Sequence, residues 1–312
     1  MIPTTTRSAS HSLRGILIAQ IEAARRHLLS SRLPSDASIH AARKALTRAR
    51  ATLRLLRPSL VESTYRGANT RLRNVAAALR AARDAKVLLD TVAVLLKSEP
   101  DCVRPVFGGL TRLLARERAA AGRALVSDGY GAVCGPQVLR DLASEVRRWP
   151  AERADAAYVI AALRRTFKKT RKAMAIARQR RTNATLHESR KQLKYLIYEL
   201  QLLQPLGPKY LGRRLLTARR LAQLLGLDHD LALLREKIKL KAGGRISRAK
   251  LSAFAATLNH RRLAAQKKSD VVGARLFAQT PRHFVQRLDR RSAIAQTLAF
   301  SSVRFNAAIS QK

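Results

Sequence analysis

Two stretches of the sequence are alike: "IHAARKALTRARATLRLLRP" at residues 39–58 and "LHESRKQLKYLIYELQLLQP" at residues 186–205. In each, a histidine is followed three and four positions later by Arg-Lys, then by leucines at helical spacing, and finally by a proline. Apolar residues three or four positions apart share one face of an α-helix. We therefore expect two equivalent helices, each with a leucine face beside a basic face.

The likeness continues along the chain at an almost constant offset. The histidines His40 and His187 are 147 residues apart (187 − 40), and the Arg-Lys pairs and leucines after them repeat at the same offset. Further on, Asp84 in the first half matches Asp230, which is 146 residues later (230 − 84). Agreement at so many positions indicates an internal duplication.

The hydrophobic pattern predicts an all-α fold, because most long segments have the helical period and alternating strand patterns are absent. The expected helices cover residues 12–30, 37–57, 63–82, 84–97, 108–126, 136–149, 155–179, 185–204, 208–226, 228–241, 248–268 and 280–300. We predict two pseudo-symmetric four-helix bundles, formed by residues 1–150 and 151–312.

Polar residues mark the starts of the two matching helices. Asp36 and Ser38 fall at the same repeat positions as Asn183 and Thr185, and all four are good N-cap residues. Thr185 with Glu188 is expected to form a capping box.

The charge of the chain is strongly positive, with 62 Lys and Arg against 20 Asp and Glu and a formal net charge of +42. Such a surplus opposes the compact state by self-repulsion, which favours a polyanionic partner: nucleic acid, an acidic membrane or a polymer of phosphate. Two cysteines and the lack of an apolar run of about 18 residues predict a cytoplasmic protein without a membrane span.

The second repeat places His187, Arg190, Lys191 and Lys194 on one helical stripe. Stacked cations of this kind repel one another unless water or an anion screens them. A phosphate chain suits the stripe, because Arg offers a planar fork to phosphate oxygens and Lys offers a mobile charge. The alternative interpretation is a solvated basic face with a histidine near the cap.

The first repeat supplies a similar stripe from His40, Arg43 and Lys44. Thr47 stands where the second repeat has Lys194, and Arg48 flanks that position. The two stripes are therefore not identical, and the symmetry of a shared site is in question.

Other predicted helices also carry clustered cations that could line a channel or groove between the bundles. These candidates are Arg25, Arg26, Arg73, Arg80, Lys168, Arg171, Lys172, Arg213, Arg219 and Arg220.

The paired "H-x-x-R-K-x-L" helices, each followed by a helix with a matching aspartate, resemble the conserved histidine α-helical domain, or CHAD. The resemblance covers essentially the whole chain and implies two bundles around a strongly basic central cavity that binds inorganic polyphosphate. It implies that the two stripes line this cavity and that Arg25, Arg26, Arg171 and Lys172 contribute from the preceding helices. The expected role is non-catalytic binding without a cofactor, with association with polyphosphate granules as one outcome.

Two alternatives remain open from the residues. The charge also suits RNA or DNA through counterion release, although aromatic residues make up only 4% of the chain and do not cluster among the arginines. His229-Asp230, together with His187 and Asp289, has the order of a metal-dependent phosphohydrolase. The repeat partner of His229-Asp230 is Arg83-Asp84, which favours a structural acid that starts a helix or pairs with an arginine.

Overall fold

The all-α prediction is confirmed by a computed structural model, which describes residues 9–30, 34–97, 104–127, 134–149, 156–240 and 248–289. All regular elements in these ranges are helical. They are α1 (Ala9–Leu28), α2 (Asp36–Leu56), η1 (Arg57–Ser59), α3 (Glu62–Ala78), α4 (Arg80–Leu96), α5 (Arg104–Ser127), α6 (Cys134–Arg148), α7 (Ala156–Arg180), α8 (Asn183–Leu203), η3 (Gln204–Leu206), α9 (Pro208–Leu240), α10 (Arg248–Leu276) and α11 (Pro281–Asp289).

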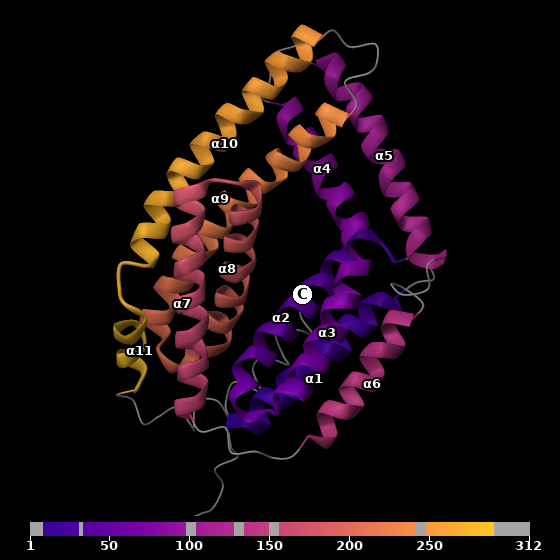
Figure 1. The fold of residues 1–312 in the computed structure, drawn as a ribbon. Helices are drawn as coiled ribbons and strands as arrows, with labels where there is room; N and C mark the ends of the chain where they lie inside the picture. Colours follow the sequence, from indigo (N-terminus) through magenta and orange to yellow (C-terminus); the bar gives the residue numbers. More distant parts are fainter. Residues whose placement is uncertain are drawn as a thin grey trace, which may run out of the picture.

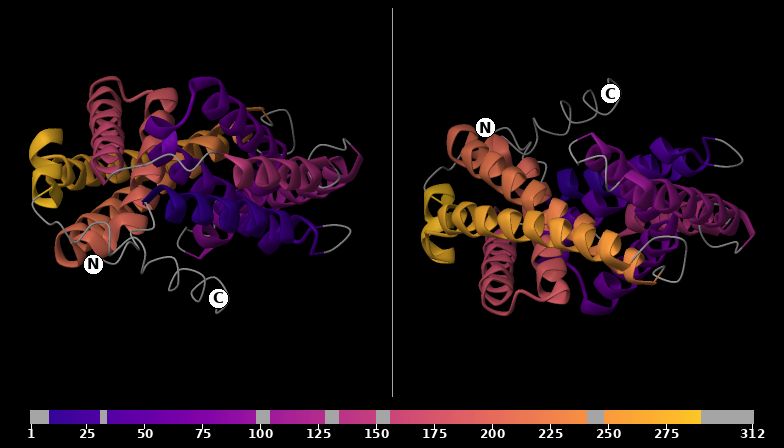
Figure 2. Two further views of the ribbon diagram at one scale, coloured as in Figure 1. Left: turned by 90° about the horizontal axis from the view of Figure 1, so that it is seen from below. Right: turned by 90° about the horizontal axis from the view of Figure 1, so that it is seen from above.

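The helices form two groups that follow the order of the chain (Figure 1). In the first group α1 packs against α2 and α6, and α3 packs against both α2 and α6. In the second group α8 lies between α7 and α9, while α10 packs along α9 and α11 packs against α7. The α4–α5 hairpin extends from the first group toward the far ends of α9 and α10 (Figures 1 and 2).

Two apolar clusters hold these groups together. The larger cluster contains buried residues from both halves, including Leu46 of α2 and Leu193 of α8. The smaller cluster joins the α4–α5 hairpin to α9 and α10 through residues such as Leu88, Leu231 and Phe254. The halves are thus in contact through α2 with α7 and α8, and through α4 with α9.

The matching helices α2 and α8 behave alike in the structure. Each has 21 residues and runs directly into a three-residue 3-10 helix that contains the closing proline. The leucines that match between the repeats are buried in both copies: Leu46, Leu53, Leu55, Leu56, Leu193, Leu200, Leu202 and Leu203. The predicted leucine faces are therefore confirmed, while the duplication itself stays an interpretation of the sequence.

The N-caps lie earlier than the sequence pattern predicted. The side chain of Ser35 accepts a hydrogen bond from the Ser38 amide, and Thr182 forms a capping box with Thr185. The predicted box of Thr185 with Glu188 is wrong, because Thr185 is already in the third helical position. Ser35 and Thr182 are themselves equivalent at the repeat offset of 147 (182 − 35).

Two other helix boundaries differ from the prediction. The segments 208–226 and 228–241 were expected as separate helices, but α9 continues through Gly226 as one helix of 33 residues. The first half does break at the equivalent point, at Leu79 between α3 and α4. The last predicted helix, 280–300, corresponds to α11, and its remaining residues lie outside the described part of the chain.

None of the helices in the described ranges combines the length and the apolar character that a membrane span requires.

Candidate anion-binding cavity

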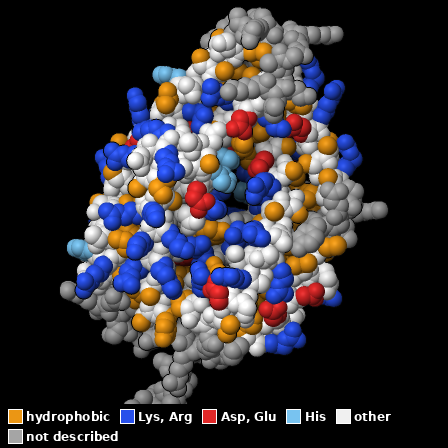
Figure 3. Space-filling view, in the orientation of Figure 1, with side chains coloured by type: hydrophobic (Ala, Val, Ile, Leu, Met, Phe, Trp, Pro, Cys, Tyr) orange, Lys and Arg blue, Asp and Glu red, His pale blue; other side chains and the backbone are white. Residues whose placement is uncertain are grey.

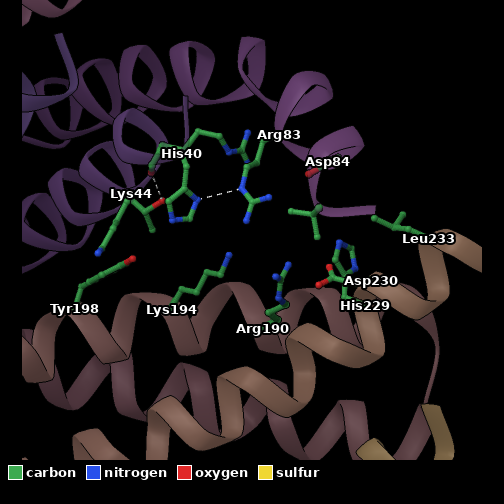
Figure 4. Close-up of a pocket in the computed structure, with 13 residues that line it drawn as sticks. His40, Lys44, Arg83, Asp84, Arg190, Lys194, Tyr198, His229, Asp230 and Leu233 are labelled. Atoms are coloured by element: carbon green, nitrogen blue, oxygen red, sulfur yellow. Dashed lines mark hydrogen bonds between the residues drawn. The ribbon is translucent and has the colours of Figure 1, made fainter. Parts of the chain in front are cut away.

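A cavity of about 340 Å³ lies where the two halves face each other. One wall comes from α2 and α4 of the first half, and the opposite wall comes from α8 and α9 of the second half (Figure 4). In the space-filling view the hollow near the centre of the molecule has histidine, Lys and Arg side chains at its edge (Figure 3). The lining residues are His40, Arg43, Lys44, Thr47, Arg83, Asp84, Val87, Arg190, Lys194, Tyr198, His229, Asp230 and Leu233.

The repeat places equivalent residues on the two walls. Arg43 and Arg190 face the cavity from α2 and α8, and Asp84 and Asp230 face it from α4 and α9. Both helix pairs therefore present the same positions to one shared space. The cavity is the place where the two basic stripes meet.

The wall carries more positive than negative charge. Five lining residues are Lys or Arg, and two are aspartates. In the described part of the chain, neither aspartate is within ion-pair distance of an arginine or lysine. The two aspartates therefore do not neutralise the wall through direct ion pairs, and an anionic ligand would be attracted to its surplus of positive charge.

The first-half wall is ordered by two hydrogen bonds. Arg43 donates from Nη1 to the carbonyl oxygen of Ala76 at 2.9 Å, which ties α2 to α3. Arg83 donates from Nε to Nδ1 of His40 at 3.1 Å (Figure 4). Because Nδ1 accepts this bond, the His40 ring is neutral in this arrangement.

Two further imidazoles lie on the second-half side, His229 in the cavity wall and His187 beside it. The rings of His187 and His229 are 5.0 Å apart between centroids. Burial, followed by the charges of Arg190 and of His187, lowers the pKa of His229 to about 4. Burial and the nearby Arg190 also lower the pKa of His187.

The pKa values of two cations in the cavity, Lys194 and Arg190, are also lowered. The Lys194 side chain is reached by solvent through the cavity, and protein atoms surround it closely. This burial, together with the charges of Arg190 and Arg43, lowers its pKa to about 8. Burial also lowers the pKa of Arg190, although Asp230 and Asp84 oppose this shift. Each of these shifts shows that the free cavity disfavours positive charge, so a bound anion would relieve it.

Some predicted site residues do not reach the cavity. Lys191 is exposed and pairs with Glu188, because it lies further around α8 than Arg190 and Lys194. His187 contacts His229 from beside the cavity, and Arg48 faces a neighbouring small pocket, where it lies over the Tyr198 ring at 5.7 Å.

The cations of the supporting basic helices do not line this cavity. The apolar faces of these helices pack against the hydrophobic core, so their Lys and Arg side chains lie on the outer surface. Some of them form ion pairs there; Arg25, for example, pairs with Glu22 at 2.9 Å. Predicted lining residues that are absent from the cavity wall are Arg25, Arg26, Arg73, Arg80, Lys168, Arg171, Lys172, Arg213, Arg219 and Arg220. Of these, Arg80 is close enough to affect the pKa of His187, and Arg219 that of Tyr198.

The sequence pattern missed the cavity role of Arg83, Asp84, His229 and Asp230. Asp230 lies in the interior of α9, so the interpretation that it starts a helix is wrong. The available signal was the repeat itself, which pairs Arg83-Asp84 with His229-Asp230. The fifth missed residue, Tyr198, lies one helical turn after Lys194 on the same face of α8.

The residues of the predicted phosphohydrolase site lie partly at the cavity. His187, His229 and Asp230 lie near one another, and the side chain of Asp289 is outside the described residues. Within the described ranges, no three His, Cys, Asp or Glu residues are gathered in a way that could hold a metal ion.

Comparisons with known proteins place this architecture in a family. The CHAD domain model matches residues 15–239. The fold is similar to the CHAD domain from the plant Ricinus communis, with a TM-score of 0.67 and 20% identity over 87% of this chain and 92% of that one. It is also similar to PptA from Streptomyces chartreusis, with a TM-score of 0.65 and 16% identity over 87% of this chain and 100% of that one. No curated protein matches the sequence. The family match covers well over half of the sequence, and the chain belongs to the CHAD domain family.

Proposed function

We propose that this protein binds inorganic polyphosphate in the cavity between its two halves and does not act on it catalytically. The observation that carries the proposal is the meeting of Arg43 and Lys44 from α2 with Arg190 and Lys194 from α8 across one cavity. Four cations on opposite walls suit a ligand with negative charge on all sides. A phosphate chain has this property, because every unit carries charge and strong acceptor oxygens.

The electrostatics of the free cavity support an anionic ligand. The pKa of Lys194 is lowered to about 8 and that of His229 to about 4, in both cases first through burial. The Nε of Arg190 is buried without a hydrogen-bond partner among the described residues. An anion in the cavity would compensate these unfavourable states, whereas a neutral ligand would not.

The composition of the wall supports binding without reaction. The cavity is lined by neither serine nor cysteine among the described residues, and the Thr47 hydroxyl donates to the Arg43 carbonyl at 2.8 Å. His40 accepts a hydrogen bond from Arg83 at Nδ1, so this nitrogen is not free to take a proton from a nucleophile. The wall thus offers cations and donors for holding phosphates. Within the cell, such binding suits association with polyphosphate granules.

A competition titration tests the proposal against nucleic acid. A labelled long-chain polyphosphate is bound to the protein at physiological salt and displaced with unlabelled polyphosphate, single-stranded RNA or duplex DNA. We expect polyphosphate to displace the label at far lower phosphate concentration than either nucleic acid. Equal displacement by RNA would show a general polyanion binder and would contradict the proposal.

A further inference from the structure

The outer face of α7 is an unusual basic surface. This helix of 25 residues contains eight Lys and Arg and no Asp or Glu. All eight side chains are exposed: Arg164, Arg165, Lys168, Lys169, Arg171, Lys172, Arg178 and Arg180. In the part of the chain that the structure describes, no carboxylate pairs with any of them. We call these eight residues the α7 basic face.

The fold does not require this surface. The equivalent helix of the first half is α1, which begins 147 residues earlier (156 − 9) and has three arginines. Arg14 donates to the carbonyl oxygen of Trp149 at 2.5 Å, and Arg25 pairs with Glu22 at 2.9 Å. The same helix in the same architecture therefore forms with few cations, two of which are engaged within the protein.

A cationic route connects the cavity with the α7 basic face across α8. Arg190 and Lys194 point into the cavity, and Lys191 lies about 100° further around the helix toward α7. Beyond it, a groove of about 260 Å³ runs between α7 and α8; Lys169 and Lys172 line it from α7, and Glu188, the ion-pair partner of Lys191, lines it from α8. The cavity, the exposed Lys191 and the groove thus follow one another around α8.

The distribution of Lys and Arg side chains on the molecular surface agrees with this route (Figure 3). Lys and Arg side chains cover the part of the molecule over α7, on the same face as the mouth of the cavity (Figures 1 and 3). Along α7, Arg164, Lys168 and Arg171 follow at spacings of four and three residues, which places them in one row. A chain that leaves the cavity on this side would find a further row of cations beside it.

We propose that the α7 basic face is an exterior extension of the cavity, on which the remainder of a long polyphosphate chain lies. This inference rests on the proposed function, because a chain must first occupy the cavity. Linked contacts on one polymer act at high effective concentration, so the extension raises affinity for long chains and leaves that for short chains unchanged. A nucleic acid is less suited, because α7 offers few aromatic faces for base stacking: Tyr158 lies six residues before Arg164 (164 − 158), and Phe167 is fully buried.

The test compares two sets of three charge reversals that change the net charge equally. The first variant is Lys168→Glu/Arg171→Glu/Lys172→Glu on α7. The matched control is Lys267→Glu/Lys268→Glu/Arg275→Glu on α10, whose residues are exposed and do not line the cavity. Affinities for tripolyphosphate and for long-chain polyphosphate are measured by calorimetry at physiological salt, after thermal unfolding has shown that both variants are folded.

We expect the α7 variant to lose roughly tenfold or more in affinity for the long chain, since three exposed contacts are removed and their charges are reversed. Its affinity for tripolyphosphate should equal that of the control. An equal loss of long-chain affinity in both variants would overturn the inference, because the net charge of the protein would then explain the loss. A loss of RNA binding in the α7 variant, with unchanged polyphosphate binding, would also overturn it and assign the face to nucleic acid.

The two proposals fail in different ways. If Lys194→Ala abolishes binding of both chain lengths while the α7 variant binds both normally, the cavity proposal stands and the extension is wrong. If Lys194→Ala has no effect on tripolyphosphate, the cavity proposal itself is wrong.

Discussion

Arg83 and His40 are joined by a hydrogen bond in which Nε of the arginine donates to Nδ1 of the imidazole at 3.1 Å. The bond links α4 to α2 at the cavity and requires a neutral His40 ring. Partial burial, Arg83 and Lys44 lower the pKa of His40. The cavity therefore contains an imidazole whose protonation is opposed by the same cations that would attract a ligand.

Binding should consequently take up protons. A bound polyanion reverses the local field and raises the pKa of His40 and His187 toward or above the ordinary value of about 6.5. Linkage then requires proton uptake on binding, and affinity that increases as the pH falls from about 8 to about 6. Calorimetry in two buffers of different ionisation enthalpy measures the protons directly. A His40→Gln/His187→Gln variant should take up fewer, and equal uptake would mean that these histidines serve structure alone.

His229 should contribute a loss of stability to the free protein in mild acid. The pKa of His229 is about 4 in the folded protein, against about 6.5 in the unfolded chain, so the unfolded state binds more protons between these values. Thermal unfolding of wild type and variants at about pH 7 and about pH 5 isolates this contribution, because the opposing contribution of Glu199 is common to all of them. We expect His229→Gln to reduce it, whereas His260→Gln on the exposed face of α10 should leave it unchanged. An identical drop in both variants would contradict the burial effect.

Lys194 should destabilise the free protein while it strengthens binding. Its pKa of about 8 lies below the ordinary value of 10.5, so at neutral pH its charge is more costly in the folded state than in the unfolded state. Lys194→Met should therefore raise the melting temperature and lower tripolyphosphate affinity about tenfold or more, as expected for a lost hydrogen bond to a charged group. Lys191→Met is the matched control, because Lys191 is exposed and outside the cavity. A lower melting temperature for Lys194→Met would show that the side chain is structural.

Glu199 is a buried acid that the sequence pattern did not single out. Burial raises its pKa to about 8, although Arg54 Nε lies 3.8 Å away and the Thr166 hydroxyl donates to it at 2.9 Å. A raised carboxyl pKa means that stability is lost as the pH rises between about 4.5 and 8, because the folded state then binds more protons than the unfolded state. Glu199→Gln keeps the Thr166 contact and should be more stable than the wild type at about pH 8 in urea unfolding. A destabilised variant would mean that Glu199 is ionised and paired with Arg54.

The sequence predicts the helices and the leucine faces well, because both depend on local periodicity. Leu46 and Leu193 are fully buried, as the repeat indicated. The caps were placed one to three residues late, since Ser35 and Thr182 precede residues that are equally good caps. The continuity of α9 through Gly226 depends on packing against α8 and α10, which local sequence does not show.

The residues that line the cavity were harder to predict than the helices that carry them. Arg190 was identified because it repeats at Arg43, and Lys194 because it follows Arg190 by four residues on the same helical stripe. Their distinction from Lys191 depends on which side of α8 faces α4 and α9, a property of tertiary packing. The role of Arg83 follows from its bond to His40, which is 43 positions away in sequence (83 − 40).

The most direct test of the account is a calorimetric titration of long-chain polyphosphate into two variants that each lose two positive charges. Arg43→Gln/Arg190→Gln removes the equivalent arginines on opposite walls of the cavity, and Lys267→Gln/Lys268→Gln removes two exposed cations of α10. At physiological salt we predict about a hundredfold loss of affinity for the cavity variant, from two charge-assisted contacts, and less than about a threefold loss for the α10 variant. Equal losses in two folded variants would contradict the account, because net charge alone would then explain the binding.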